Sequence, residues 1–167
     1  MSGPYNLVSF AGMGALNSVS GVTASLPAGA VLGQERLEGG FKYRLFYNAG
    51  GADISTGFGF QRGKGGTGAY SVSVSTVSGV KAQGAGVCYN VSSTTGTYFW
   101  GVVRGGPLTL RCSNVSVATN AAIQLGVNGV FTLDPVETAA VGYNLGDTTT
   151  GTGTTDATTG RFFVMFE

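Results

Sequence analysis

The chain has 167 residues, which suits a single domain, because a chain of this length can bury about two-thirds of its unfolded surface in one core. Charged residues make up only 10% of the sequence, against roughly 25% in typical globular proteins, and the formal net charge is +1. No basic cluster is present, so the electrostatic footprint of a nucleic-acid or anionic-membrane binder is missing. The shortage of charge instead predicts a surface covered by partners or coated with Ser, Thr and Gly.

Two absences bear on compartment and chemistry. No apolar run approaches the roughly 20 residues that cross a bilayer, and no Lys or Arg precedes the first apolar residues as in a signal peptide. We therefore expect a protein made in a cytoplasm. The chain contains no His, which removes the usual general base of hydrolases and the commonest zinc ligand. The sequence predicts no enzyme activity, no cofactor and no metal site.

Residues 1–30 are predicted to form an extended arm, because glycines interrupt every short apolar run and glycine disfavours helices. An arm that cannot bury itself lies on another surface. Its larger apolar residues are therefore candidate contacts with a partner: Tyr5, Leu7 and Phe10. Residues 31–167 are predicted to form a single β domain, with strands beginning at 31–36 and 41–47.

The segment 41–47 alternates basic and aromatic side chains, and 69–78 alternates Ser with Val, which is typical of strands with one wet and one buried face. Between them, residues 57–68 are rich in glycine and are predicted to be a flexible loop. Arg62 and Lys64 in this loop are candidate subunit contacts. A phosphate-binding loop is strongly disfavoured, because three residues instead of four separate its first Gly from the Gly-Lys pair, and a strand follows.

Residues 98–112 hold the only Trp, within a run of aromatic and β-branched residues that is followed by Gly-Gly-Pro and a second apolar run. Such residues favour a half-buried pleated surface, whereas Gly and Pro interrupt a strand. The segment therefore predicts strand, bend and strand at the centre of the domain. Its candidate core residues are Tyr98, Phe99, Trp100 and Pro107.

Further strands are predicted at 86–91, 121–126, 129–135, 139–143 and 162–166, with a hairpin turn at 127–129. Residues 147–160 are almost wholly Thr, Gly, Asp and Ala, which predicts a second flexible loop. Many short strands separated by glycine-rich turns, with no sustained helical period, indicate an all-β fold. We expect a sandwich or barrel-like domain of jelly-roll or β-tulip type.

Two pairs of acidic residues have the spacing that a glycosidase could use, namely Glu35 with Glu38 and Asp134 with Glu137. Solvated carboxylates at turns or strand edges are the favoured interpretation of both, because a catalytic pair needs a pocket that perturbs it. Cys88 and Cys112 could pair, but two cysteines are too few for a disulfide scaffold, and buried free thiols are expected.

Two segments, Tyr-Arg-Leu-Phe-Tyr-Asn-Ala-Gly-Gly at 43–51 and Gly-Thr-Tyr-Phe-Trp-Gly-Val-Val-Arg-Gly-Gly-Pro at 96–107, resemble small virion structural proteins of tailed bacteriophages. Residues 140–147 extend the resemblance. Proteins of this family, called capsid decoration or cement proteins, are β-rich and sit on the outside of the capsid.

The resemblance implies a non-enzymatic protein that is assembled in the host cytoplasm, binds the major capsid protein on the virion surface and stabilises the shell. It also implies a homo-oligomer, with a trimer favoured to match a local three-fold axis of the capsid. Arg36 joins the arm and the loop residues as a candidate contact. The alternative is a receptor- or glycan-binding module of a phage tail fibre or spike, with Trp100, Tyr98 and Tyr70 as stacking faces.

Overall fold

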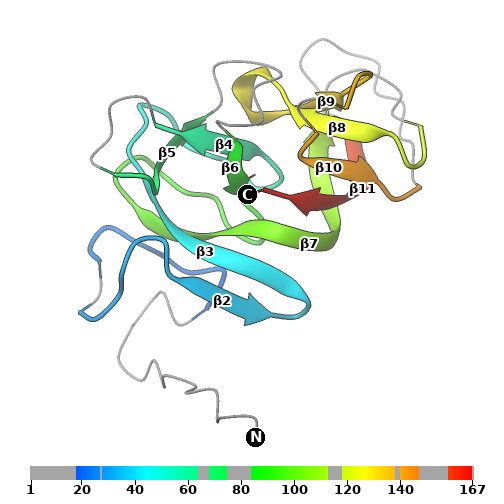
Figure 1. The fold of residues 1–167 in the computed structure, drawn as a ribbon. Helices are drawn as coiled ribbons and strands as arrows, with labels where there is room; N and C mark the ends of the chain where they lie inside the picture. Colours follow the sequence, from blue (N-terminus) through cyan, green and yellow to red (C-terminus); the bar gives the residue numbers. More distant parts are fainter. Residues whose placement is uncertain are drawn as a thin grey trace, which may run out of the picture.

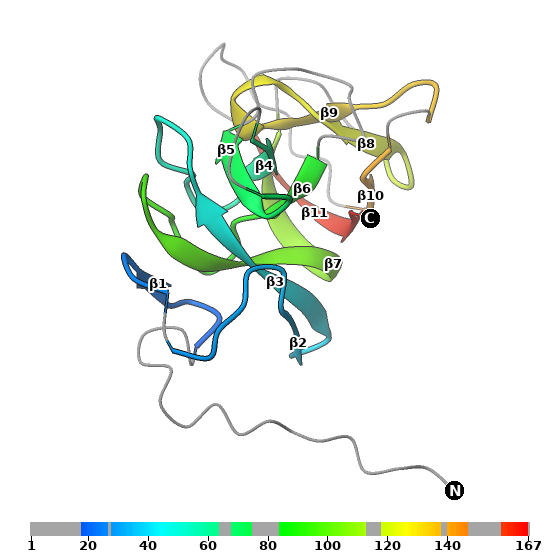
Figure 2. The ribbon, with the colours of Figure 1, turned by 60° about the vertical axis from the view of Figure 1, so that its left-hand side comes forward.

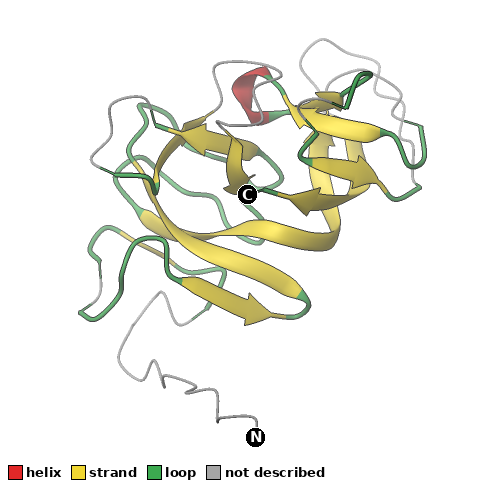
Figure 3. Cartoon of the chain, viewed as in Figure 1, coloured by secondary structure: helices red, strands yellow, loops and turns green. Residues whose placement is uncertain are grey.

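The fold is an all-β assembly of short strands, as predicted (Figure 1, Figure 3). The computed structural model describes residues 18–26, 28–63, 68–74, 84–112, 118–137, 140–146 and 158–166. Within these ranges the strands are β1 (Val22–Thr23), β2 (Glu35–Glu38), β3 (Phe41–Asn48), β4 (Gly59–Arg62), β5 (Ser71–Val74), β6 (Gly84–Val87), β7 (Tyr98–Cys112), β8 (Ala122–Leu125), β9 (Phe131–Leu133), β10 (Gly142–Asn144) and β11 (Thr158–Met165). A short 3-10 turn, η3 (Val127–Gly129), joins β8 to β9.

The strand β7 coincides with the predicted central segment 98–112 and runs through both halves of the molecule (Figure 1). Its first half pairs antiparallel with β3, and its second half pairs antiparallel with β11. The predicted bend is a register irregularity inside one continuous strand, where β7 and β11 slip between Phe162 and Val164. Gly106 and Pro107 lie opposite this slip, and Pro107 is exposed. The expectation that Pro107 belongs to the core is therefore wrong, because exposed and buried residues alternate from Pro107 to Cys112 and Pro107 is on the exposed face.

The first half of β7 closes a ring with four other strands. The order around it is β7, β6, β4, β5, β3 and back to β7. Strand direction cannot alternate all the way round a ring of five strands, so one neighbouring pair must be parallel. That pair is β3 with β5. The predicted barrel-like fold is confirmed by this closure.

The second half of β7 closes another ring, through β9, β8, β10 and β11. Here the parallel pair is β7 with β9. The two rings share one continuous core, because a Cβ at Gly59 in β4 of the first ring would approach Phe131 and Leu125 of the second. Because β7 serves both rings, its 15 residues make it the longest of the described strands.

Phe60 of β4 lies at the centre of the first ring. Its side chain is 0% exposed, and its ring stands edge-on to Phe46, at 4.9 Å between centroids, and to Phe99, at 5.3 Å. Glycines leave the space that it occupies, because a Cβ at Gly101 would lie 2.5 Å from the Phe60 ring and one at Gly86 would lie 2.8 Å from it.

The prediction of a flexible loop over 57–68 is therefore wrong for 59–62, which form strand β4. A Cβ at Gly59 would meet core side chains. Glycine is therefore required at this position by close packing, not by the flexibility of a loop. The predicted loop at 147–160 is likewise too long, because β11 begins at Thr158. Residues 64–67 and 147–157 lie outside the described residues.

Two buried asparagines hold equivalent strand ends in the two rings. Asn48 at the end of β3 donates from Nδ2 to the carbonyls of Ala52 and Ser93, and its Oδ1 accepts from the N–H of Gly50. Asn144 at the end of β10 donates from Nδ2 to the carbonyl of Ala118, and its Oδ1 accepts from the N–H of Gly146. Both sit in Tyr-Asn-x-Gly segments, so the same local chemistry ends a strand in each ring.

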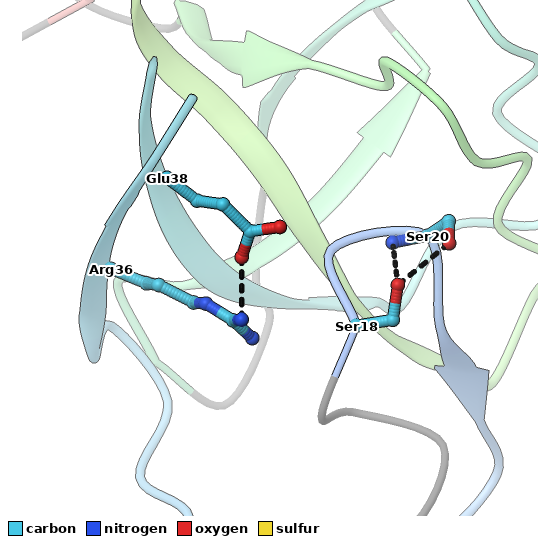
Figure 4. Close-up of polar contacts among 4 residues, drawn as sticks. All are labelled: Ser18, Ser20, Arg36 and Glu38. Atoms are coloured by element: carbon cyan, nitrogen blue, oxygen red, sulfur yellow. Dashed lines mark hydrogen bonds and ion pairs between the residues drawn. The ribbon is translucent and has the colours of Figure 1, made fainter. Parts of the chain in front are cut away.

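The predicted arm does not extend as far as residue 30, because the described residues from 18 onward pack on the domain. β1 pairs with β7, with Val22 opposite Phe99, and Val19 and Ala30 are buried in the core (Figure 2). A short turn leads into β1, in which the hydroxyls of Ser18 and Ser20 lie 2.8 Å apart (Figure 4). Residues 18–30 are thus joined to the domain wherever they are described, while 1–17 lie outside the described residues.

Both cysteines are free and buried, Cys88 after β6 and Cys112 at the end of β7. Burial raises the pKa of the Cys112 thiol to about 12 and raises the pKa of Cys88 further. Because only the thiolate reacts, we expect a thiol-specific reagent at pH 8 to modify the native protein at least about 100-fold more slowly than the protein in denaturant. Equal rates in the two conditions, followed by absorbance of the released chromophore, would contradict this burial.

Candidate contact surface

The predicted contact residues that the structure describes lie on two different strands. Arg36 is on β2, half-buried, with its Nη2 2.5 Å from Oε2 of Glu38 (Figure 4). Arg62 is the last residue of β4 and is exposed, with Val72 as its strand partner. The other four predicted contacts lie outside the described residues: Tyr5, Leu7, Phe10 and Lys64.

A cluster of charged side chains covers the β2–β3 hairpin. Oε2 of Glu35 lies 2.8 Å from Nζ of Lys42, and its Oε1 lies 2.5 Å from Nη2 of Arg44. The hydrogen bond from Arg44 is the largest cause that lowers the pKa of Glu35, and the bond from Lys42 acts in the same direction. The guanidinium of Arg44 also lies 5.8 Å from the centre of the Tyr70 ring, a favourable cation–π arrangement.

Neither of the two acidic pairs has the arrangement that a pair of catalytic carboxylates needs. Successive side chains of a strand point to opposite faces, so Glu35 and Glu38, three residues apart, cannot face one reactant. Each carboxylate is instead ion-paired on its own face. Asp134 is buried in the turn after β9, where Oδ1 accepts from the N–H of Val136, and Glu137 is exposed.

The expected core aromatics of β7 lie at different depths. Trp100 is 1% exposed and Phe99 is 0% exposed, so neither presents a ring face to a ligand. Tyr98 is half-buried and packs on Tyr47 of β3 at 4.8 Å between ring centroids. Of the residues considered as stacking faces for a glycan, Tyr98 and Tyr70 are partly exposed. The sequence did not indicate that Tyr47 would pack against Tyr98.

The strand β2 forms an edge of the sheet and carries the most exposed large apolar side chain among the described residues, Leu37, at 81% (Figure 1). Sequence reasoning did not identify this edge. The sequence signal available here is the Gly39-Gly40 dipeptide, which indicates the β2–β3 hairpin but not the edge: its positive φ angles of 58° and 84° suit a two-residue turn.

The described residues contain no cluster of three or more His, Cys, Asp or Glu side chains that could hold a metal ion. Within the same ranges, no helix is long and apolar enough to span a membrane.

No protein-family model matches the chain, and no curated protein matches it in sequence. Among solved structures, the chain is similar to the N base of the head fibre protein gp8.5 from bacteriophage phi29, with a TM-score of 0.52 and 6% sequence identity. The match covers 73% of this chain and 93% of the phage chain. At this identity the likeness is one of fold alone.

Proposed function

We propose that this chain is a structural protein of a phage virion, and more specifically a decoration or cement protein that binds the outer surface of the capsid. The observation that carries the proposal is the fold shared with the base of a phage head fibre over most of both chains. The resemblance of residues 43–51 and 96–107 to small virion proteins supports it from the sequence.

The surface is consistent with this role. The chain carries few charges, and interface cores are depleted in charge relative to the rest of a protein surface. Under the proposal the chain binds the major capsid protein and further copies of itself, it performs no catalysis and it needs no cofactor. The segment that precedes β1 and the exposed Arg62 make the contact with the shell.

The second candidate function is a receptor- or glycan-binding module of a phage tail fibre or spike. Two observations favour it: the structural neighbour is itself a fibre protein, and the half-buried Tyr47 and Tyr98 present a paired aromatic surface. Because Trp100 is buried, a bound glycan would stack on these tyrosines. Binding of glycans that disappears in Tyr98→Ala, without binding to capsids, would favour this function over the first.

Capsid binding tests the proposed contacts. In co-sedimentation with capsids that lack the chain, removal of residues 1–17 is expected to abolish binding, and the melting temperature of the shortened protein is the control for folding. Arg62→Glu is expected to weaken binding about 10-fold, on the order of 1.4 kcal/mol for a charge at a contact.

Arg104→Glu serves as the matched control, since Arg104 is also exposed but lies on β7, which does not pair with the strand β4 that carries Arg62. It is expected to bind as the unmodified protein does. Full binding by the protein without residues 1–17 would overturn the role of this segment, and equal losses for the two arginine variants would show a nonspecific charge effect.

A further inference from the structure

The backbone of β2 directs hydrogen-bonding groups away from the sheet. Leu45 of β3 makes both of its backbone hydrogen bonds toward this side, accepting from Gly33 and donating to Gln34, each at 2.9 Å. In an antiparallel ladder, residues alternate between bonding to one neighbour and bonding to the other. Tyr43, two residues before Leu45, therefore also bonds toward β2, where its register partner is Arg36.

The same alternation applies along β2. Arg36 and Glu38 direct their backbone groups inward to β3, so Glu35 and Leu37 direct theirs outward. Among the described residues no strand lies beyond β2 (Figure 1). An edge of this kind can accept another strand through its free N–H and C=O groups.

The charges on β2 determine the register in which a second copy of β2 can pair with it. If a second copy of β2 pairs with the first across a two-fold axis, the residue on the axis faces its own twin. An axis at Glu35, Arg36 or Glu38 brings two like charges together, which destabilises a cross-strand pair. An axis at Leu37 is the remaining choice.

This remaining register is favourable at residues 36–38. It places the outward N–H and C=O groups of Leu37 against those of Leu37 in the second copy, and it covers a side chain that is 81% exposed. It also places Arg36 opposite Glu38 of the second copy, and Glu38 opposite its Arg36. Each guanidinium then lies between two carboxylates, its own and that of the second copy.

We propose that two copies of this chain associate through antiparallel pairing of their β2 strands about a two-fold axis at Leu37. The inference goes beyond the virion role, because it rests on β2 alone and holds in the absence of capsids. A four-residue strand buries less area than a stable dimer requires, so the contact is weak in solution and acts most strongly between copies that are held side by side.

The test is sedimentation velocity of the full chain at concentrations up to about 1 mM, the range of weak dissociation constants. We expect the unmodified protein to dimerise, and Arg36→Glu and Glu38→Arg to weaken this association at least about 10-fold when each is measured alone. When the two variants are mixed in equal amounts, every cross-strand pair becomes Glu with Arg, and dimers are expected to return to within about threefold of the unmodified level.

Recovery of the dimer on mixing shows that the charges act between copies. Loss of the Arg36–Glu38 ion pair within one copy could not be repaired by mixing. Leu37→Glu is expected to abolish the dimer, whereas Val136→Glu, a change of similar character at a side chain that is 69% exposed in the second ring, leaves it intact. A monomer at 1 mM, no recovery on mixing, or an oligomer that none of the β2 variants changes would overturn the proposal.

Discussion

Phe60→Ala is expected to lower the free energy of unfolding by about 3–5 kcal/mol, the usual cost of removing a fully buried aromatic side chain. The Phe60 ring is 0% exposed and contacts Phe46 and Phe99 edge-on, so truncation removes two aromatic pairs and opens a cavity inside the first ring. Urea denaturation followed by fluorescence of Trp100 measures the loss. Phe163→Ala, at a half-buried position of β11, is the control with a smaller expected loss.

Gly101→Ala tests whether glycine makes room for Phe60. In the native protein the new methyl group would lie 2.5 Å from the Phe60 ring and 3.0 Å from Phe46, which predicts a loss of about 1–3 kcal/mol from overpacking. In the Phe60→Ala background the methyl group has space. The double variant is therefore expected to lose less than the sum of the two single losses, and strict additivity would contradict the packing of Phe60 against Gly101.

Asn48→Ala is expected to cost about 2–4 kcal/mol, because it removes three hydrogen bonds that a side chain of 0% exposure makes to the backbone. These bonds tie the end of β3 to the turns at Ala52 and Ser93, so the variant is also expected to speed amide hydrogen exchange at Gly50. Denaturant unfolding and hydrogen exchange measure the two effects.

Asn48→Asp separates the hydrogen bonds from the loss of volume. It keeps an acceptor for Gly50 but replaces the Nδ2 donor with an oxygen that faces the carbonyls of Ala52 and Ser93, so we expect a loss at least as large as that of Asn48→Ala. Asn144→Ala is expected to lose a similar amount in the second ring. A loss under about 0.5 kcal/mol for Asn48→Ala, the usual effect of a surface substitution, would contradict its role.

The sequence predicts the all-β class and the central strand because these depend on local signals. Aromatic and β-branched residues mark β7 from Tyr98 to Cys112 without reference to the rest of the chain. Ring closure is different, since it depends on pairings such as β3 with β5 and β7 with β9 between strands that are not neighbours in sequence. No short-range pattern encodes these pairings, and the sequence could therefore not distinguish a sandwich from two linked rings.

The error at β4 has a specific physical cause. Glycine is common in loops because it adopts conformations that other residues disfavour, and a count of glycines over 57–68 therefore predicts a loop. At Gly59 the structure requires glycine for the opposite reason, since a Cβ would meet Leu125 and Phe131 in the core. Phe60, flanked by glycine and glutamine, gives the one apolar signal of this strand.

The proposed contact between two copies includes features that the sequence did not indicate. Arg36 and Arg62 are accessible on the surface, but charge alone does not reveal that β2 is an edge strand or that Leu37 is exposed. Both facts depend on the pairing of β2 with β3 and on the absence of a further strand beside β2 among the described residues. The charges at residues 35, 36 and 38 become informative only once that edge is known.

Cryo-electron microscopy of the particle from which the chain comes tests the proposed virion role most directly. We expect density for the two linked rings on the outer surface of the shell, in contact with the major capsid protein through the segment that precedes β1. Density for the chain in a tail fibre or spike would contradict the decoration role, and its absence from purified particles would contradict a structural role in the virion altogether.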